Sequence, residues 1–218
     1  MGYYESVSMT PAVGRLIELG GAPFARELTS ADDQLLHLGP IGASIREVQA
    51  QKNGFFCFES ALRFFPSTTV EFSWGTSDWN SSSLWKAAYG GIANDIFCFA
   101  EDVFGRQFVV NGEKITVFDP ETGDLEIVAP SLEEWASIML LDFRQLTGHP
   151  LAHQWQTVHG PLHPRDRLIP RTPFVLGGEF SIENLEALDS VRVMKNLGNL
   201  ASQIHDLPNG AKIQFKIL

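Results

Sequence analysis

The sequence predicts an α+β fold in which an antiparallel meander sheet packs against several helices. The first observation behind this prediction is that apolar residues alternate along short segments between residues 96 and 129, as in strands that bury one face. The alternating residues are Phe97, Phe99, Phe108, Val110, Ile115, Val117, Leu125 and Ile127. The second observation is that turn residues separate these segments, and the third is a helical pattern that follows them directly.

The turns are short, so neighbouring strands must run antiparallel. Residues 102–105 close the first corner and residues 119–124 close the third. Between them, Asn111-Gly112 is the dipeptide most typical of a two-residue hairpin, because both residues tolerate the left-handed backbone that such a turn needs. The sequence therefore predicts a meander of consecutive hairpins.

A helix is expected immediately after Pro130. Ser131 suits the N-cap, and the carboxylates of Glu133 and Glu134 suit the first turn of a helix. Apolar side chains then recur at helical spacing at Trp135, Ile138, Met139 and Phe143. This helix is predicted to cover the meander.

Outside this unit the patterns predict further helices and one further strand. Helices are expected over residues 10–19, 29–38, 41–52, 83–89 and 190–204, and a strand near residues 55–58. Residues 61–66 fit either a helix or a strand, and residues 74–83 have the composition of a loop.

The last third of the chain is expected to extend the same domain. Residues 148–171 are rich in proline, histidine and arginine and predict a long ordered connection, and residues 173–180 predict a strand. Ile213, Phe215 and Ile217 alternate, which predicts a final strand that completes the sheet. We therefore expect a single domain over residues 1–218, in which residues 148–218 are a C-terminal extension.

Composition restricts the class of protein. The chain has 218 residues, of which 44% are hydrophobic, so it can bury a substantial core. Its formal net charge is −10, which argues against direct binding of nucleic acid and suits a basic partner, although negative charge also serves solubility alone.

Localisation and redox state follow from the same sequence. We expect a cytoplasmic protein without a membrane span, because no secretory signal and no apolar run of about 18 to 20 residues is visible. Cys57 and Cys98 each lie in an apolar run, where a thiol usually behaves as a small buried side chain, so no disulfide framework is predicted.

Two groups of residues are candidates for binding a partner. Trp74 and Trp79 lie in the predicted loop, where tryptophan either fixes the loop to the core or anchors an interface. Acidic residues gather in the turns and in the helix start: Glu101, Asp102, Asp119, Glu121, Asp124, Glu126, Glu133 and Glu134. They either form a negative binding surface or are there because carboxylates suit turns and helix starts.

Four histidines raise the question of a metal site. They are His149, His153, His159 and His163. The first two have the spacing of one helical face, but Pro150 suits the first helical position, so the two imidazoles need not converge. We expect structural or exposed histidines rather than a metal centre.

No catalytic motif is assembled in the sequence. It lacks a GxGxxG loop, a phosphate-binding GxxxxGK[ST] loop and a GxSxG elbow. Glu101 and Asp102 are adjacent in a predicted strand, so their carboxylates point to opposite sides and cannot both act on one substrate. We therefore expect no enzyme and no cofactor.

Four short motifs carry a resemblance to a known family. They are LWKAAYGG, AEDVFGRQF, FDPETG and SLEEW, and they occur in this order within residues 54–146. This region resembles the SMI1/KNR4, or SUKH, superfamily. The resemblance implies an SMI1/KNR4-like α+β module, which in bacteria commonly acts as an immunity protein against a polymorphic toxin and elsewhere acts as a regulatory binding module. It implies no catalytic residues.

The sequence thus leads us to expect a non-enzymatic protein-binding module, namely a bacterial immunity protein that neutralises a cognate toxin. The expected partner is a basic domain such as a nuclease, and the residues expected to bind it are Trp74, Trp79, Glu101, Asp102, Asp119, Glu121 and Asp124. Two alternatives stay open: a regulatory scaffold of the SMI1/KNR4 type, and a metal-dependent enzyme using residues 149–163, with Arg165 or Arg167 binding an anionic substrate.

Overall fold

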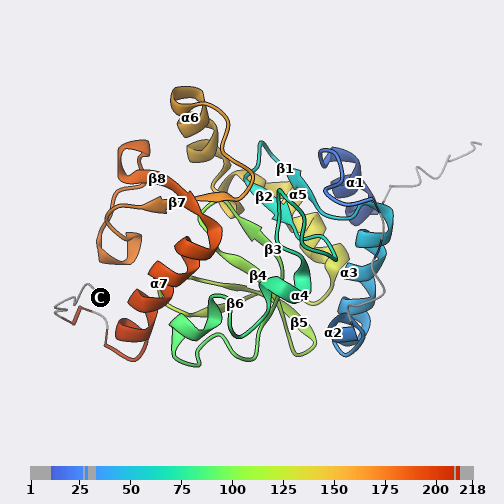
Figure 1. Cartoon of the computed structure of the whole chain (residues 1–218), viewed down its shortest axis with the longest axis horizontal. Helices are drawn as coiled ribbons and strands as arrows, with labels where there is room; N and C mark the ends of the chain where they lie inside the picture. The colour runs from blue at the N-terminus through green and yellow to red at the C-terminus, as the bar shows by residue number, and fades with distance from the viewer. Residues whose placement is uncertain (1–10, 27, 29–32, 209, 212–218) are drawn as a thin grey trace, which may run out of the picture.

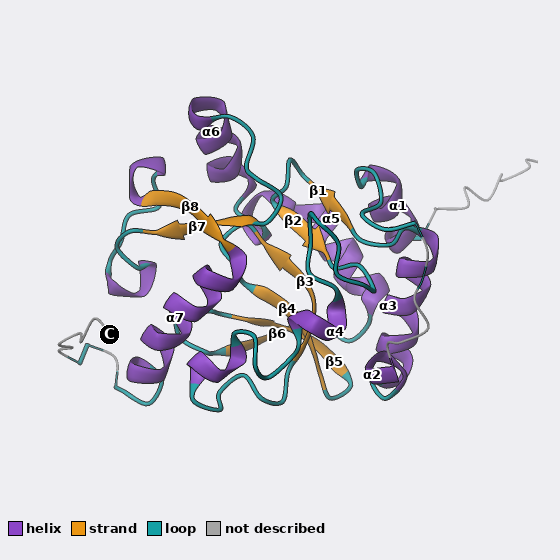
Figure 2. Ribbon diagram, in the orientation of Figure 1, coloured by secondary structure: helices purple, strands orange, loops and turns teal. Residues whose placement is uncertain are grey.

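A six-stranded antiparallel meander forms the centre of the protein, which confirms the predicted α+β fold (Figures 1 and 2). The computed structural model describes residues 11–26, 28, 33–208 and 210–211. Each strand pairs with the next one in the chain. The strands are β1 (Phe55–Cys57), β2 (Leu62–Phe64), β3 (Phe97–Asp102), β4 (Gln107–Asn111), β5 (Lys114–Phe118) and β6 (Leu125–Ala129).

Helices cover both faces of this sheet. One face packs against α1 (Ala12–Leu19), α3 (Gly39–Gln51) and α5 (Leu132–Leu146), with α2 (Asp33–Leu36) beside α3. The other face packs against α4 (Thr76–Trp79), the 3₁₀ helix η1 (Lys86–Tyr89) and α7 (Ser190–Ile204). The period-2 pattern of the strands therefore separates two cores, because alternate side chains enter opposite layers.

Aromatic rings form the centre of each core. On the α5 face, Trp135 is fully buried and lies 5.1 Å from the ring of Phe99 and 5.4 Å from that of Phe108. On the α7 face, the ring of Tyr89 lies 5.4 Å from that of Trp85 and 5.2 Å from that of Phe118. Such ring pairs add specific contacts to the apolar area that they bury.

The turns and helix starts follow the local chemistry of the sequence. Gly112 has φ 60° in the β4–β5 hairpin, a left-handed conformation that glycine adopts without steric cost. Ser131 caps α5, since its hydroxyl accepts the N–H of Glu134 at 3.2 Å. The predicted cap at Ser131 is confirmed, as is the helix over residues 190–204. The β4–β5 hairpin also forms, but Asn111 is the last residue of β4 and pairs with Lys114, so the two turn residues are Gly112 and Glu113 rather than Asn111 and Gly112.

The C-terminal part forms its own layer beside the meander. It contains α6 (His149–His159) and a two-stranded sheet of β7 (Asp166–Pro170) and β8 (Leu185–Asp189), followed by α7. Short 3₁₀ helices η2 (Phe174–Leu176) and η3 (Ile182–Asn184) lie between the two strands. Figure 1 shows β7, β8 and α6 at the end of the molecule opposite α1 and α3. The predicted final strand, at residues 213–217, lies outside the described residues.

Several local predictions need correction. The expected connection over residues 148–171 contains α6 and β7, and the expected strand over residues 173–180 is a loop with η2. Pro173 and Gly177, with φ 88°, flank η2 and restrict it to a single turn. Residues 61–66, which fitted either type, contain β2, and the loop at residues 74–83 includes α4.

A substitution at Gly148 tests how closely the start of the C-terminal layer packs on the meander. Its φ is 68°, and an added Cβ would lie 2.2 Å from Cε2 of Phe104. Gly148→Ala should lower the free energy of unfolding by about 2 to 4 kcal/mol, from backbone strain plus overpacking. Denaturant unfolding would measure this loss.

Gly177→Ala is the matched control. Gly177 has φ 88° but nothing within 4 Å of an added Cβ, so only the strain of about 1 kcal/mol is expected. Equal losses in the two variants would contradict the close packing of Gly148 on Phe104.

Candidate functional site

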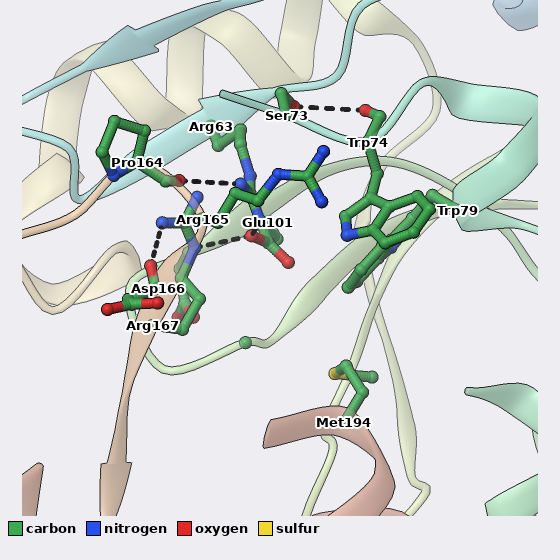
Figure 3. A network of polar contacts seen from close by, with 12 residues as sticks. Arg63, Ser73, Trp74, Trp79, Glu101, Pro164, Arg165, Asp166, Arg167 and Met194 are labelled. Atoms are coloured by element: carbon green, nitrogen blue, oxygen red, sulfur yellow. Dashed lines mark hydrogen bonds and ion pairs between the residues drawn. The ribbon is translucent and has the colours of Figure 1, made fainter. Parts of the chain in front are cut away.

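A buried ionic cluster joins the meander to the C-terminal layer (Figure 3). It consists of Arg63 on β2, Glu101 on β3 and Arg167 on β7, whose side chains have no exposed surface. Oε1 of Glu101 pairs with Nη2 of Arg63 and lies 2.5 Å from Nε of Arg167. Nε2 of Gln107 donates to the second carboxylate oxygen at 3.0 Å. One carboxylate thus holds two guanidinium groups from segments far apart in the sequence.

The electrostatics of the cluster reflect its burial. Burial opposes ionisation of Glu101, but Arg167 and Arg63 overcome this effect and hold the pKa of the carboxyl below its ordinary value. Burial, together with repulsion from Arg167, lowers the pKa of Arg63 to about 9. The backbone carbonyl of Pro164 also accepts a bond from Arg63, at 3.0 Å. Glu101 is therefore a structural group inside the protein rather than a surface carboxylate.

Both candidate tryptophans fix their loop to the protein. Trp79 is fully buried, and its Nε1–H donates to Oε1 of Gln107 at 2.7 Å. Trp74 is half-buried and stacks under the guanidinium of Arg165, whose Cζ lies 4.9 Å from the ring centre. Arg165 in turn donates to the carbonyl of Val70 at 2.9 Å. Of the two tryptophans, Trp74 retains some accessible surface.

Asp102 is a second buried carboxylate and organises the β3–β4 corner. It accepts the N–H groups of Phe104 and Arg106, each at 2.9 Å, and pairs with the guanidinium of Arg106. Arg106 also donates to the carbonyl of Leu146 at the end of α5, at 2.8 Å. Burial raises the pKa of Asp102 despite this pairing. Trp79, Glu101 and Asp102 therefore lie inside the protein and not on the partner-binding surface that we expected for them.

The β5–β6 turn carries the three remaining candidates, and each has a different role. Asp119 accepts the N–H of Glu121 at 2.7 Å and so closes the turn. Glu121 is buried and accepts the N–H groups of Phe174 at 3.1 Å and Val175 at 2.7 Å, at the start of η2. Asp124 is exposed, with 74% of its side chain accessible. The turn thus fixes η2 and directs one carboxylate outward.

The other acidic residues divide in the same way. Glu133 accepts the N–H of Val13 at 3.2 Å and also that of Ala12, at the start of α1. Glu126 and Glu134 are exposed. Some carboxylates therefore accept backbone N–H groups at turns and helix starts that would otherwise lack a partner. The others give the protein a negative outer surface.

A cavity of about 550 Å³ lies where the β5–β6 turn, the α5–α6 junction and the C-terminal layer meet. Its walls are mostly apolar: Phe104, Pro120, Pro150, Leu151, Pro170 and Phe174. The cavity opens to solvent, and Phe180 and Val175 lie at its mouth with 70% and 44% exposure. The ring of Phe180 stacks on that of Phe174 with 4.0 Å between centroids. The volume of this cavity, its apolar walls and its open mouth are typical of a ligand-binding pocket.

Polar groups surround this apolar interior. Asp119, Thr122 and Arg144 contribute to the lining, and Arg144 is exposed. Arg106 also lines the cavity, but its guanidinium is bound by Asp102 and the end of α5. A second cavity, of about 670 Å³, lies between the start of α3 and the β4–β5 hairpin and has a more polar lining. The first cavity is therefore the better candidate for binding an apolar group.

The histidines do not gather at one point. His153 Nδ1 lies 2.7 Å from a carboxylate oxygen of Glu59, and His149 Nε2 lies 3.9 Å from the other. His159 instead stacks on Trp155, 4.5 Å between ring centres, and His163 accepts the N–H of Arg165 at 3.3 Å. Within residues 11–26, 28, 33–208 and 210–211, no group of three or more His, Cys, Asp or Glu residues is arranged to hold a metal ion.

Most residues that build this region are not among those predicted from the sequence. For Arg63 a signal exists, because an arginine between Leu62 and Phe64 in an apolar run indicates a buried cation. Arg106 has no such signal, and the pattern around Phe174 and Phe180 predicts a strand instead of a pocket wall. No local pattern reveals the cavity, because its walls come from segments that are distant in the sequence.

The comparisons with known proteins show the fold but no family. No protein-family model and no curated protein matches the chain. Among solved structures, the chain is similar to the crystal structure of Atu4351 from Agrobacterium tumefaciens, with a TM-score of 0.55 and 14% sequence identity. The match covers 84% of this chain and 86% of that chain. In the described part of the chain, no helix is long and apolar enough to cross a membrane.

The ionic cluster yields a stability prediction. Glu101→Gln keeps the shape of the side chain but leaves Arg63 and Arg167 buried without their carboxylate. The free energy of unfolding should fall by about 3 to 5 kcal/mol in denaturant titrations, because breaking a buried ion pair leaves charge uncompensated.

Glu186→Gln is the control for this variant. Glu186 is exposed and lies 3.8 Å from Arg171, so the change should cost about 1 kcal/mol or less. A similarly small effect of Glu101→Gln would show that the cluster does not stabilise the junction.

Proposed function

We propose that this chain is a non-enzymatic protein-binding module that acts as a bacterial immunity protein and neutralises a cognate toxin by binding it. The observation that carries the proposal is the open apolar cavity between the β5–β6 turn and the C-terminal layer. Protein interfaces concentrate their binding energy in a few large side chains that enter such desolvated pockets. On this proposal, the partner inserts an apolar side chain there.

Preorganisation of the cavity supports the proposal. Glu121 fixes the start of η2 through two backbone N–H groups, and Asp102 fixes Arg106, which also lines the cavity. Phe180 rests on Phe174 although it is mostly exposed. A pocket whose walls are already held in place costs little ordering free energy when a partner binds. Phe180 and Val175 would then form an apolar margin around the inserted side chain.

The charge of the protein supports a basic partner. The net charge is −10, and Asp124 projects from the turn that lines the cavity. A toxin that acts on nucleic acid carries clustered lysine and arginine, because it must bind phosphates. An acidic protein is steered toward such a surface and covers it once bound. Neutralisation would therefore follow from occlusion and needs no chemistry by this chain.

Identification of the partner and disruption of the cavity together test this proposal. The tagged chain is purified from its source cells at moderate salt, and the co-purified protein is identified and expressed alone to test toxicity. We expect one stoichiometric partner that is toxic by itself and harmless when co-expressed with this chain. A partner without toxicity would contradict the immunity role.

Variants at the mouth of the cavity test the site itself. Val175→Asp and Phe180→Ala should each weaken partner binding at least about tenfold, as measured by calorimetry. The first variant places a charge at the apolar margin, and the second removes an aromatic ring from it. Leu141→Ala is the control, since Leu141 is 87% exposed on α5 and does not line the cavity. Equal affinities for all three variants would exclude the cavity as the binding site.

A further inference from the structure

Strand β6 is an edge of the sheet that exposes apolar side chains. Within the described part of the chain, β5 is its neighbour on one side and no strand pairs with the other side. Leu125 is 41% exposed and Ile127 is 62% exposed. Proteins usually protect an edge strand with charge, a bulge or a covering segment, because its unpaired backbone groups bind other extended chains. Here the edge carries one carboxylate, Glu126, and a register shift after Ile127, but the side chains of Leu125 and Ile127 stay accessible.

The register of β6 gives its two faces different chemistry. Leu125 is paired with Phe118 and Ile127 with Thr116, so both side chains lie on the α7 face of the sheet. Glu126 is paired with Val117 and lies on the opposite face, where it is exposed. The edge therefore presents two apolar side chains on one face and a carboxylate on the other.

The backbone of the same residues is suited to pairing. The N–H of Asp119 donates to the carbonyl of Asp124 at 2.9 Å, which marks a hydrogen-bonded position at the start of the ladder. The alternation of an antiparallel ladder then turns the backbone N–H and C=O groups of Leu125 and Ile127 away from β5. A register shift follows Ile127, so the regular edge covers residues 125–127.

We propose that this edge binds an extended segment of the protein partner in which apolar residues alternate with lysine or arginine. Apolar residues of that segment would lie beside Leu125 and Ile127, and a cation would lie beside Glu126, with Asp124 nearby. The inference rests on the proposed function. The edge also continues from the cavity, because Asp119 and Thr122 line the cavity and lead into β6.

A synthetic peptide tests the edge without knowledge of the partner. The probe is the heptapeptide Lys-Val-Lys-Val-Lys-Val-Lys with blocked ends, labelled for fluorescence anisotropy, and the comparison peptide has glutamate in place of every lysine. The full chain should bind the lysine peptide at least about tenfold more tightly than the glutamate peptide. Hydrogen exchange should show new protection of the backbone N–H groups of Leu125 and Ile127, which point away from β5.

Three variants separate edge pairing from simple charge attraction. Ile127→Ser and Glu126→Lys should each weaken peptide binding at least about fivefold. Val158→Ser is the matched control and should leave binding unchanged, because Val158 is 66% exposed on α6, away from the edge. Equal binding of both peptides, or equal binding by Ile127→Ser and Val158→Ser, would overturn the proposal.

If a second copy of the protein or another segment of the same chain occupies the edge, the experiments give different results. A dimer in light scattering that Ile127→Ser dissociates would assign the edge to a second copy and overturn the proposal. Protection of the N–H groups of Leu125 and Ile127 in the free monomer would assign the edge to the chain itself, with the same consequence. If Val175→Asp weakens binding of the identified toxin and Ile127→Ser does not, the edge inference fails while the proposed function stands.

Discussion

The carboxylate of Glu101 is held between the guanidinium groups of Arg63 and Arg167, and this contact joins the two parts of the protein. The three residues come from β2, β3 and β7, so this contact fixes the C-terminal layer against the meander. All three side chains are fully buried, where an unpaired charge is costly. The position of β7 then determines where η2 and Phe174 lie, and with them the wall of the cavity.

Carboxylates serve two purposes in this protein, and burial distinguishes them. Asp102 and Glu121 lie inside, where each accepts two backbone N–H groups that would otherwise lack a partner. Asp124 and Glu126 lie outside, next to the cavity and on the sheet edge. Some of the acidic residues therefore stabilise the fold, and the others are exposed and can contact a basic partner. A surface charge count taken from sequence alone would overstate the available part.

The sequence predicts the meander well because its signals are local. Alternation indicates the strands, and Gly112 forms the β4–β5 turn one residue later than predicted, together with Glu113. Leu125 and Ile127 alternate as predicted but are exposed rather than buried, and Ser131 determines the start of α5. Helix α6 has almost no apolar periodicity, because Ala152 is its one fully buried side chain, and the sequence therefore does not predict it. The Glu101 cluster and the cavity could not be predicted, since Arg63 and Arg167 are 104 positions apart in the sequence and meet only in the folded chain.

We propose that the junction between the meander and the C-terminal layer is a protein-docking site. Hydrogen exchange of the chain with and without the partner proposed above provides the test. We expect protection on binding to concentrate in residues 119–127 and 173–180, around the cavity and the β6 edge. Protection confined to α1 and α3, at the other end of the molecule, would contradict it.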